Sequence, residues 1–576
     1  MNSIAKGQNK IAAVIAVLLN AILFFINISF YNCVFATNDD YRMNLIVSGA
    51  YTGEPSANLV FMRYPIAWLL SGLYNITDNI PWYGIGTMLC IFVPSCIICY
   101  FVIREADKKG RLLMGILAYL LFYLFIVQKH IVLPQFTATA AFMSVAWLAL
   151  IWYMPSKRSF FHIVAAAFIA VVAFCIRMKI FFMVLPAGIL VIAAKTMFSD
   201  TKDRKYMKMC MISCLTAVVL CGLSYASDRV NYQPEYKEFN TARSQTYDYG
   251  ALPPYDMNKD FYDAAEIDES TYYSISARHL DMDDQITTNN LQDIVGFIAQ
   301  KDGRSFVKKC LESAFGSILH FFDGAVVYQA IFVFAIMLLS FIEAYKKKKR
   351  DYALIIAVLF AGMLLEMTYL VFRSRVMERF TEVFLLVIAV VSLISYISML
   401  DKKPEVFKGG VFRYKNLYRA AAAVCAVCVI VCIAVANQRA VTSKSKHQNL
   451  VNSRLETLNA LAQTDRSSFY FYDAYDFIGA SADVFSVYDG MVNTDSLGNW
   501  YINSEDYFER NSMYGFKNSI DGLIDGNKNI YFAAIGNLKN GVKLLLKERY
   551  NMEAVIIDTI PYENNNIYIY TFVPCG

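Results

Sequence analysis

The chain has 576 residues, of which 57% are hydrophobic and 18% are charged, and its formal net charge at pH 7 is +5. Several apolar runs of about 20 residues are long enough to cross a bilayer, which excludes a soluble globular protein. The Lys and Arg residues are concentrated in short loops between these runs, as membrane topology requires, so the positive charge does not point to a nucleic-acid partner.

The first apolar run, 11–31, follows Lys6 and Lys10. It is longer than the apolar region of a typical cleaved signal peptide and is not followed by a clear small-x-small cleavage motif, so we expect an uncleaved signal anchor. Ten further runs complete a prediction of eleven membrane spans, at 82–103, 112–128, 131–153, 160–176, 180–196, 208–227, 318–341, 352–372, 380–400 and 417–437.

The apolar segment 57–76 is not predicted to cross the membrane. It carries Arg63 and Pro65, and a span here would place the cationic segment 104–111 outside. We therefore expect an interfacial helix lying on the outer surface.

Eleven spans place the N-terminus in the cytoplasm and the C-terminus outside. The segments predicted to lie inside hold 24 Lys and Arg residues, whereas the short outer segments hold 8. This asymmetry supports the orientation, and we expect a multi-pass protein of the plasma membrane.

The predicted fold class is a polytopic α-helical membrane protein with a small C-terminal extracytoplasmic α/β domain. The membrane domain would cover 1–437 with large outer loops at 32–81 and 228–317, and the second domain would cover 438–576. In this second domain a helical pattern covers 537–550, and strand-like runs occur at 467–473, 528–535, 553–560 and 566–573.

Two adjacent acids, Asp39 and Asp40, follow the first span. A carboxylate at the membrane surface can take a proton from an attacking hydroxyl, or it can hold a divalent cation such as Mg²⁺ or Mn²⁺ against a phosphate. Alternatively, one of the acids caps a helix expected at 41–49. The pair is our candidate for the catalytic residues, and the metal requirement stays open.

Cations also gather at two predicted outer turns. We consider them candidate ligands for a lipid phosphate, because guanidinium groups bind phosphate in a bidentate manner. The alternative is that they reach ordinary lipid headgroups. These candidates are Arg177, Lys179, Arg373, Arg375 and Arg379.

Other polar residues in the outer segments are candidate substrate contacts. Aromatic faces stack on sugar rings, although a Tyr-rich loop can also simply lie on a membrane. Polar residues near the turn between the third and fourth spans can equally bond a neighbouring helix. This set comprises Arg63, Lys129, His130, Gln135, Arg243, Asp248 and Tyr249.

The chain resembles multi-pass glycosyltransferases of the GT-C superfamily, closest in character to bacterial glucosyltransferases that use lipid-linked sugars to modify surface polysaccharides. The resemblance covers roughly 1–400 and rests on Asn38-Asp39-Asp40-Tyr41, on the segments 48–55, 81–84 and 135–137, on Tyr236-x-x-Phe239-Asn240-x-x-Arg243, on Asp248-Tyr249, and on Arg373-Ser374-Arg375. It implies a hexosyltransferase with a polyprenyl-phosphate or pyrophosphate donor and a cell-envelope glycan or glycolipid acceptor. It also implies that Asp39 or Asp40 is the base and that outer Arg residues bind the donor phosphate.

Two other functions stay open at this point. A flippase or transporter for a polyprenyl-linked glycan would need charged residues inside the spans and broken helices near the midplane. A glycan polymerase or ligase would also use a large outer loop with Arg residues, but it would not need an acidic pair after the first span.

Overall fold

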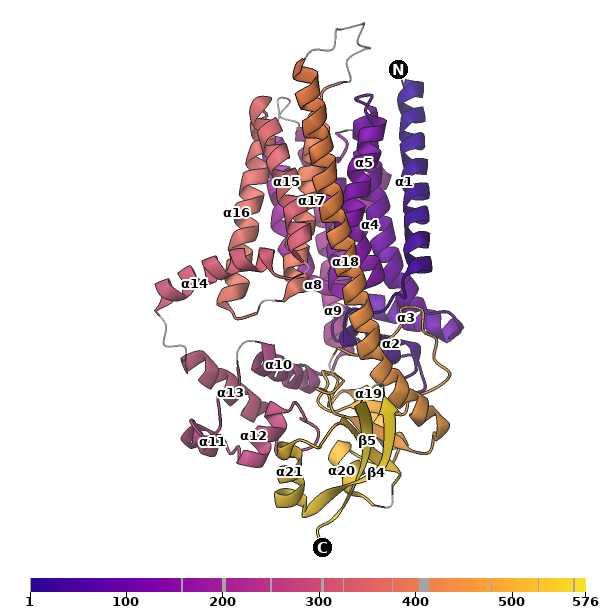
Figure 1. The fold of residues 1–576 in the computed structure, drawn as a ribbon, viewed down its shortest axis with the longest axis vertical. Coiled ribbons are helices and arrows are strands. Elements are labelled where there is room, and N and C mark those ends of the chain that lie inside the picture. Colours follow the sequence, from indigo (N-terminus) through magenta and orange to yellow (C-terminus); the bar gives the residue numbers. More distant parts are fainter. Residues whose placement is uncertain are drawn as a thin grey trace.

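The computed structural model describes residues 2–156, 159–198, 204–248, 251–301, 305–324, 326–375, 377–402, 414–477, 479–526, 528–562 and 565–576. Long helices form a bundle that occupies the upper part of Figure 1, and shorter helices and a sheet lie below it. The membrane bundle consists of α1 (Asn2–Phe30), α4 (Trp82–Asp107), α5 (Leu112–Phe122) with η1 (Tyr123–Val127) and α6 (Gln128–Val132), α7 (Phe136–Trp152), α8 (Phe160–Phe198), α9 (Arg204–Asn231), α15 (Val326–Lys346), α16 (Arg350–Phe372), α17 (Glu378–Met399) and α18 (Tyr414–Thr464).

Helix α8 is a hairpin rather than one rod. Its backbone leaves the helical conformation at Arg177, where φ is −155° and ψ is 91°. His162 near its start and Lys195 near its end both bond carbonyls at the C-terminal end of α7, at 2.9 and 2.6 Å. Both ends of α8 therefore lie on one side of the membrane, and Arg177 marks the turn on the other side.

Nine of the described helices are long and apolar enough to cross a membrane. Because α8 crosses twice and the shorter apolar helix α7 adds another pass, the described chain makes the eleven passes predicted. The pass predicted at 318–341 begins later, at Val326, because Asp323 and Gly324 interrupt the helix before it. The predicted fold class, a polytopic helical membrane protein with a small C-terminal α/β domain, is confirmed.

Two helices follow α1 at the lower end of the bundle. Helix α2 (Asn38–Ser48) is mostly buried, and α3 (Tyr64–Ile76) has 13 residues, too few to span a bilayer. Helix α3 crosses the lower ends of the long helices, and Trp68, Leu69 and Ile76 on it are exposed. This arrangement is the one expected of an interfacial helix.

The region between α9 and α15 folds into short helices below the bundle. Helices α10 to α13 pack near the C-terminal domain, and the amphipathic α14 lies across the bundle end (Figure 1). These helices are α10 (Pro234–Asp248), α11 (Lys259–Ala264), α12 (Glu269–Ser276), α13 (Thr288–Lys301), α14 (Phe306–Leu319) and the 3₁₀ turn η2 (His320–Phe322).

The C-terminal domain is a five-stranded mixed sheet with strand order β2-β1-β3-β5-β4. Strand β1 pairs in parallel with β2 and β3, whereas β5 pairs antiparallel with β3 and β4. The domain contains β1 (Phe469–Tyr472), β2 (Thr494–Ser496), α19 (Glu505–Met513), α20 (Ser519–Ile524), β3 (Ile530–Ile535), α21 (Asn540–Tyr550), β4 (Met552–Tyr562) and β5 (Asn565–Pro574).

The aromatic run of β1 explains why the sheet is covered on both faces. Side chains of a strand alternate between the two faces, so Phe469 and Phe471 join a core with α20 and α21. Tyr470 and Tyr472 point to the opposite face and join the larger core that includes Leu458 of α18. Helix α18 thus runs unbroken from the membrane bundle onto the sheet.

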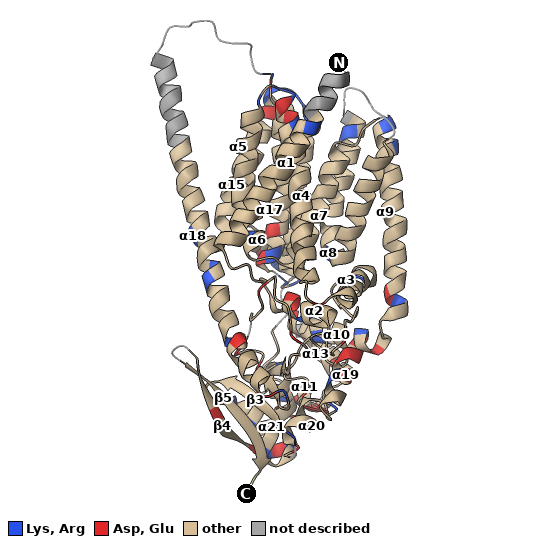
Figure 2. Ribbon diagram, turned by 90° about the vertical axis from the view of Figure 1, so that its right-hand side faces the viewer, with Lys and Arg blue, Asp and Glu red and all other residues tan. Residues whose placement is uncertain are grey.

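The orientation in the membrane remains a prediction. Figure 2 shows Lys and Arg positions at the upper ends of the helices, beside the N-terminus, which the positive-inside rule places in the cytoplasm. A topology reporter fused after Lys347 should therefore report the cytoplasm, and one fused after Ser443 should report the outside. Finding both reporters on one side would contradict this topology.

Candidate active site

Helix α2 holds the two acids at the end of the bundle. Its N-cap is Thr37, with φ −142° and ψ 153°, so neither Asp39 nor Asp40 is the capping residue. Both acids lie in the first helical turn, where the positive end of the helix dipole favours negative charge. The capping alternative is therefore wrong, and the two acids have separate surroundings.

Asp40 is fully buried and ties three segments together. It accepts hydrogen bonds from Thr37 Oγ1 at 3.0 Å, from the Tyr83 hydroxyl of α4 at 2.9 Å, and from the Phe136 backbone N–H of α7 at 3.0 Å. Burial raises the pKa of Asp40 to about 7, against the opposing effect of the Tyr83 hydrogen bond. This carboxyl group fixes α2 to the bundle and does not line the cavity that Asp39 faces.

Asp39 faces a cavity of about 590 Å³ that the membrane helices, the loops that follow α1 and α9, and the C-terminal domain enclose together. Its side chain keeps 22% exposure, and Oδ2 lies 3.9 Å from Arg379 Nη1. Burial raises the pKa of Asp39 even though Arg379, Arg177 and Arg243 act to lower it. A carboxylate with a raised pKa that is open to a cavity can accept a proton from a bound molecule.

The cavity is strongly cationic. Among its described lining residues the carboxylates are Asp39 and Asp248. The lining cations are Arg63, Arg177, Lys179, Arg243, Arg278, Arg375 and Arg379. Such an excess of positive charge in a cavity attracts anions.

Some of these cations are already paired. Arg63 bonds Asp228 of α9, and Arg375 Nη2 lies 3.1 Å from Asp248 Oδ2. The Arg177 guanidinium instead lies over the rings of Phe61 and Phe136, 4.7 and 4.9 Å from their centroids. The described residues place no carboxylate within ion-pair distance of Arg177, so its charge remains open to a ligand.

The donor set does not fit a divalent cation. Within the described ranges, no three His, Cys, Asp or Glu side chains gather in a way that could hold a metal ion. Asp39 and Asp248 in this cavity are outnumbered by guanidinium and ammonium groups that would repel Mg²⁺ or Mn²⁺.

The structure brings together most of the candidate residues from both predicted cationic turns, but not Arg373. Arg177, Lys179, Arg375 and Arg379 all line the cavity, whereas Arg373 is exposed outside it. Helix α16 ends at Phe372, and Ser374 adopts a left-handed φ of 53°. This turn directs the chain so that Arg375, the residue after Ser374, reaches the cavity.

Three candidate substrate contacts lie elsewhere. Lys129 bonds Glu378 at 2.6 Å and also Glu382, and both partners belong to α17. His130 is buried with its ring against Phe142, and Gln135 is the N-cap residue of α7. Lys129 and His130 thus contact neighbouring helices, which is the alternative considered for this group, and Gln135 does not line the cavity. Arg63, Arg243 and Asp248 do line the cavity, and Tyr249 lies outside the described residues.

The C-terminal domain supplies part of the cavity wall. Tyr475, Asn499 and Trp500 line the cavity, together with Arg278 from the segment after α12. These residues are far from Asp39 in sequence and form no recognisable local motif. Only the fold brings them into the same cavity as the acid.

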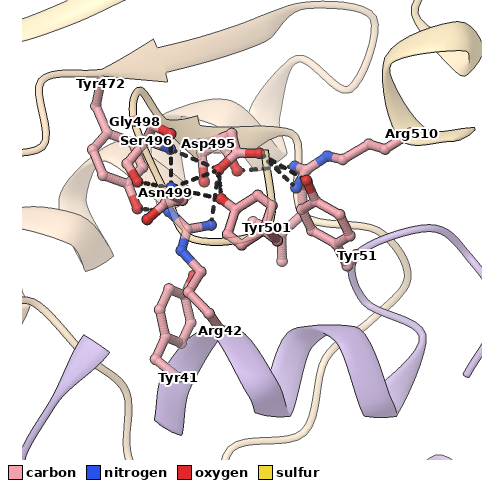
Figure 3. A network of polar contacts seen from close by, with 12 residues as sticks. Tyr41, Arg42, Tyr51, Tyr472, Asp495, Ser496, Gly498, Asn499, Tyr501 and Arg510 are labelled. Atoms are coloured by element: carbon pink, nitrogen blue, oxygen red, sulfur yellow. Dashed lines mark hydrogen bonds and ion pairs between the residues drawn. The ribbon is translucent and has the colours of Figure 1, made fainter. Parts of the chain in front are cut away.

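A buried ion cluster joins this wall to the helix that carries Asp39 (Figure 3). Asp495 of β2 lies 3.1 Å from Arg42 of α2 and 3.4 Å from Arg510 of α19. The hydroxyls of Tyr51 and Tyr501 donate hydrogen bonds to the same carboxylate. Since all these side chains are almost inaccessible to solvent, the cluster fixes α2 against the C-terminal domain.

No family model matches the chain, and no curated protein matches it. Among solved structures, it is similar to one described as ArnT from Cupriavidus metallidurans in the apo state. The match covers 97% of each chain, with 10% sequence identity and a TM-score of 0.38. With identity and TM-score this low, the activity of this multi-pass membrane protein has to be inferred from its own residues.

The ion cluster yields a prediction about stability. Asp495→Asn leaves Arg42 and Arg510 buried without their counter-charge, and breaking such a pair costs about 3–5 kcal/mol. We expect a large fall in the thermal unfolding temperature and faster proteolysis between the two domains. The matched control is Asp489→Asn in the same domain, which breaks the exposed pair with Arg466. It should change neither the unfolding temperature nor the rate of proteolysis. Equal unfolding temperatures for the two variants would contradict this role.

Proposed function

We propose that this protein is a glycosyltransferase that moves a sugar from a polyprenyl-phosphate or pyrophosphate donor to a cell-envelope glycan or glycolipid at the outer membrane face. The observation that supports it best is the position of Asp39, a carboxylate with a raised pKa, in a cationic cavity at the ends of membrane helices. This combination suits a reaction in which a hydroxyl loses a proton while a phosphate leaves.

The donor phosphate would bind the cations at the helix ends. Arg177 and Lys179 lie at the α8 turn, and Arg375 and Arg379 lie between α16 and the first turn of α17. A polyprenyl chain places its phosphate at the same lipid–water boundary. Charge-assisted hydrogen bonds from guanidinium groups would hold that phosphate as its charge increases during transfer.

Asp39 is the proposed base. The acceptor hydroxyl oxygen attacks the anomeric carbon and forms the new glycosidic bond, while the bond from that carbon to the phosphate oxygen breaks. The phosphate leaves with the electron pair, and the hydroxyl proton passes to Asp39. Asp40 is a positioning residue, because its three hydrogen bonds hold α2 in place and keep the Asp40 carboxylate out of the cavity.

This assignment separates the two acids experimentally. Asp39→Asn should lower turnover by about 10²–10⁴ while leaving the unfolding temperature near that of the parent protein, because Asp39 accepts no buried hydrogen bond in the described chain. Asp40→Asn should lower turnover and the unfolding temperature together. Radiolabelled transfer from a purified lipid donor and thermal unfolding would measure both effects. Near-normal turnover in Asp39→Asn would exclude Asp39 as the base.

The raised pKa of Asp39 also sets a pH dependence. Asp39 accepts a proton only when it is ionised, so turnover is present above its pKa and is lost as the pH falls through it. We therefore expect the acidic limb of the turnover profile to lie above the usual pH range of an exposed aspartate. Asp39→Glu should retain some turnover with a displaced limb, whereas an unchanged limb would indicate that another group titrates.

The donor assignment can be tested with a matched pair of arginines. Arg177→Ala should weaken binding of a polyprenyl phosphate roughly tenfold to a hundredfold, the equivalent of one charge-assisted hydrogen bond. Arg177→Lys should recover part of this loss, because the charge returns without the planar fork. Arg373→Ala removes a nearby cation outside the cavity and should leave binding unchanged. Equal losses in Arg177→Ala and Arg373→Ala would show that only general surface charge attracts the lipid.

A further inference from the structure

The part of the cavity wall formed with the C-terminal domain contains a strained arginine. Arg278 follows α12 and has a left-handed φ of 60°, which few residues other than glycine adopt. Its carbonyl oxygen packs so closely on Gly498 that a Cβ there would lie 1.3 Å from it. Only glycine fits at 498, so the turn is locked against the C-terminal domain at this point. Residues held in such conformations concentrate at binding and catalytic sites.

The side chain of Arg278 lies between two fixed aromatic rings. Its guanidinium carbon is 4.9 Å from the centroid of Tyr247 and 5.8 Å from that of Tyr475. The hydroxyl of Tyr247 donates to the Ile275 carbonyl at 2.6 Å, and that of Tyr475 donates to the Ser276 carbonyl at 3.1 Å. Both rings are therefore fastened to the last residues of α12, shortly before Arg278, and the guanidinium is pre-organised.

Within the described chain this guanidinium is without a counter-charge. Its Nε is buried without a hydrogen-bond partner, and the described residues place no carboxylate within ion-pair distance. A buried donor that has lost its water costs free energy unless a ligand satisfies it. If Arg278 only packed against Tyr247 and Tyr475, the ring contacts would be explained, but its Nε–H would still lack a hydrogen-bond acceptor.

Arg278 lies on a different wall from the proposed donor site. Its neighbours lining the cavity include Tyr475 and Gly498 of the C-terminal domain, whereas Arg177 and Arg379 are at the ends of membrane helices. The cations that act on Asp39 are Arg379 and Arg177 at the ends of membrane helices and Arg243 of α10. The proposed base thus interacts with cations from both the membrane helices and the loop helices, as we expect of a base that serves a donor and an acceptor.

We propose that this second wall is the acceptor subsite and that Arg278 binds an anionic group, a carboxylate or a phosphate, on a polyhydroxylated acceptor. The inference rests on the proposed function, because it takes the membrane-side cations as the donor site. A guanidinium fork with an unsatisfied donor selects planar carboxylates and phosphates over neutral hydroxyls. The enzyme would therefore discriminate charged envelope glycans from neutral ones through Arg278.

The test uses the full chain in nanodiscs of zwitterionic lipid, saturated with a polyprenyl phosphate. Glucuronic acid and glycerol 3-phosphate are titrated as anionic probes, with glucose and glycerol as their neutral counterparts. We expect at least one anionic probe to bind about tenfold or more tightly than its counterpart, and Arg278→Gln to remove that difference. The carboxylate and phosphate arms identify which anion is preferred.

Two variants separate this subsite from the donor site. Arg278→Gln should leave the affinity for polyprenyl phosphate unchanged, whereas Arg177→Gln should weaken it and leave the anionic probe unaffected. Arg278→Lys, with an unchanged unfolding temperature, should restore part of the probe binding. Arg466→Gln, an exposed arginine of the same domain, should alter neither affinity.

The inference is overturned if neither anionic probe binds more tightly than its neutral counterpart. It is also overturned if Arg278→Gln weakens polyprenyl phosphate as much as Arg177→Gln does, since Arg278 would then belong to the donor site. Should the parent protein bind no polyprenyl phosphate while probe binding still depends on Arg278, the donor proposal fails and the anion site stands.

Discussion

The site depends on one buried carboxylate that two arginines share. Asp495 meets Arg42 from α2 and Arg510 from α19, so the cluster carries one excess positive charge away from water. Burying such charges is costly unless each is hydrogen-bonded and paired. Tyrosine rings lie against both guanidinium groups. The hydroxyls of Tyr51 and Tyr501 donate further hydrogen bonds to the Asp495 carboxylate. The cluster can form only when α2 and the C-terminal domain are in register, and this register brings Asp39 and Arg278 into the lining of one cavity.

A second polar cluster holds the membrane side of the cavity. Glu378 in the first turn of α17 bonds Lys129 at 2.6 Å and Lys444 of α18 at 2.8 Å. The next residue, Arg379, faces Asp39. Glu378 thus joins α6, α17 and α18 next to Arg379. These bonds hold the start of α17, and with it Arg379, in position, although their residues do not line the cavity. Lys129, which looks like a substrate contact in the sequence, has this supporting role instead.

Features that depend on a short stretch of sequence could be predicted from the sequence alone. Apolar length predicted the membrane passes, and the short polar interruption around Arg177 predicted the α8 turn. The strand-like run at 467–473 predicted β1, whereas β2 is a three-residue Thr-Asp-Ser strand that no such run indicated. The acid pair was found by its position after α1, but only three-dimensional contacts show that Asp40 faces the bundle and Asp39 the cavity. Arg278 was missed because its environment comes from Tyr247 and Tyr475, and the latter lies almost 200 residues away along the chain.

The charge arrangement couples the proposed base to its substrates. Arg379, Arg177 and Arg243 each lower the pKa of Asp39, while burial raises it by more. A phosphate bound at Arg177 and Arg379 would offset their positive charge and add its own negative charge near Asp39. Both changes increase the proton affinity of the carboxylate, because a nearby anion disfavours its ionised form. On the proposed function, Asp39 therefore becomes a stronger base when the donor is in place. In the empty cavity the same cations act against the effect of burial and keep the proton affinity of the carboxylate lower than burial alone would make it.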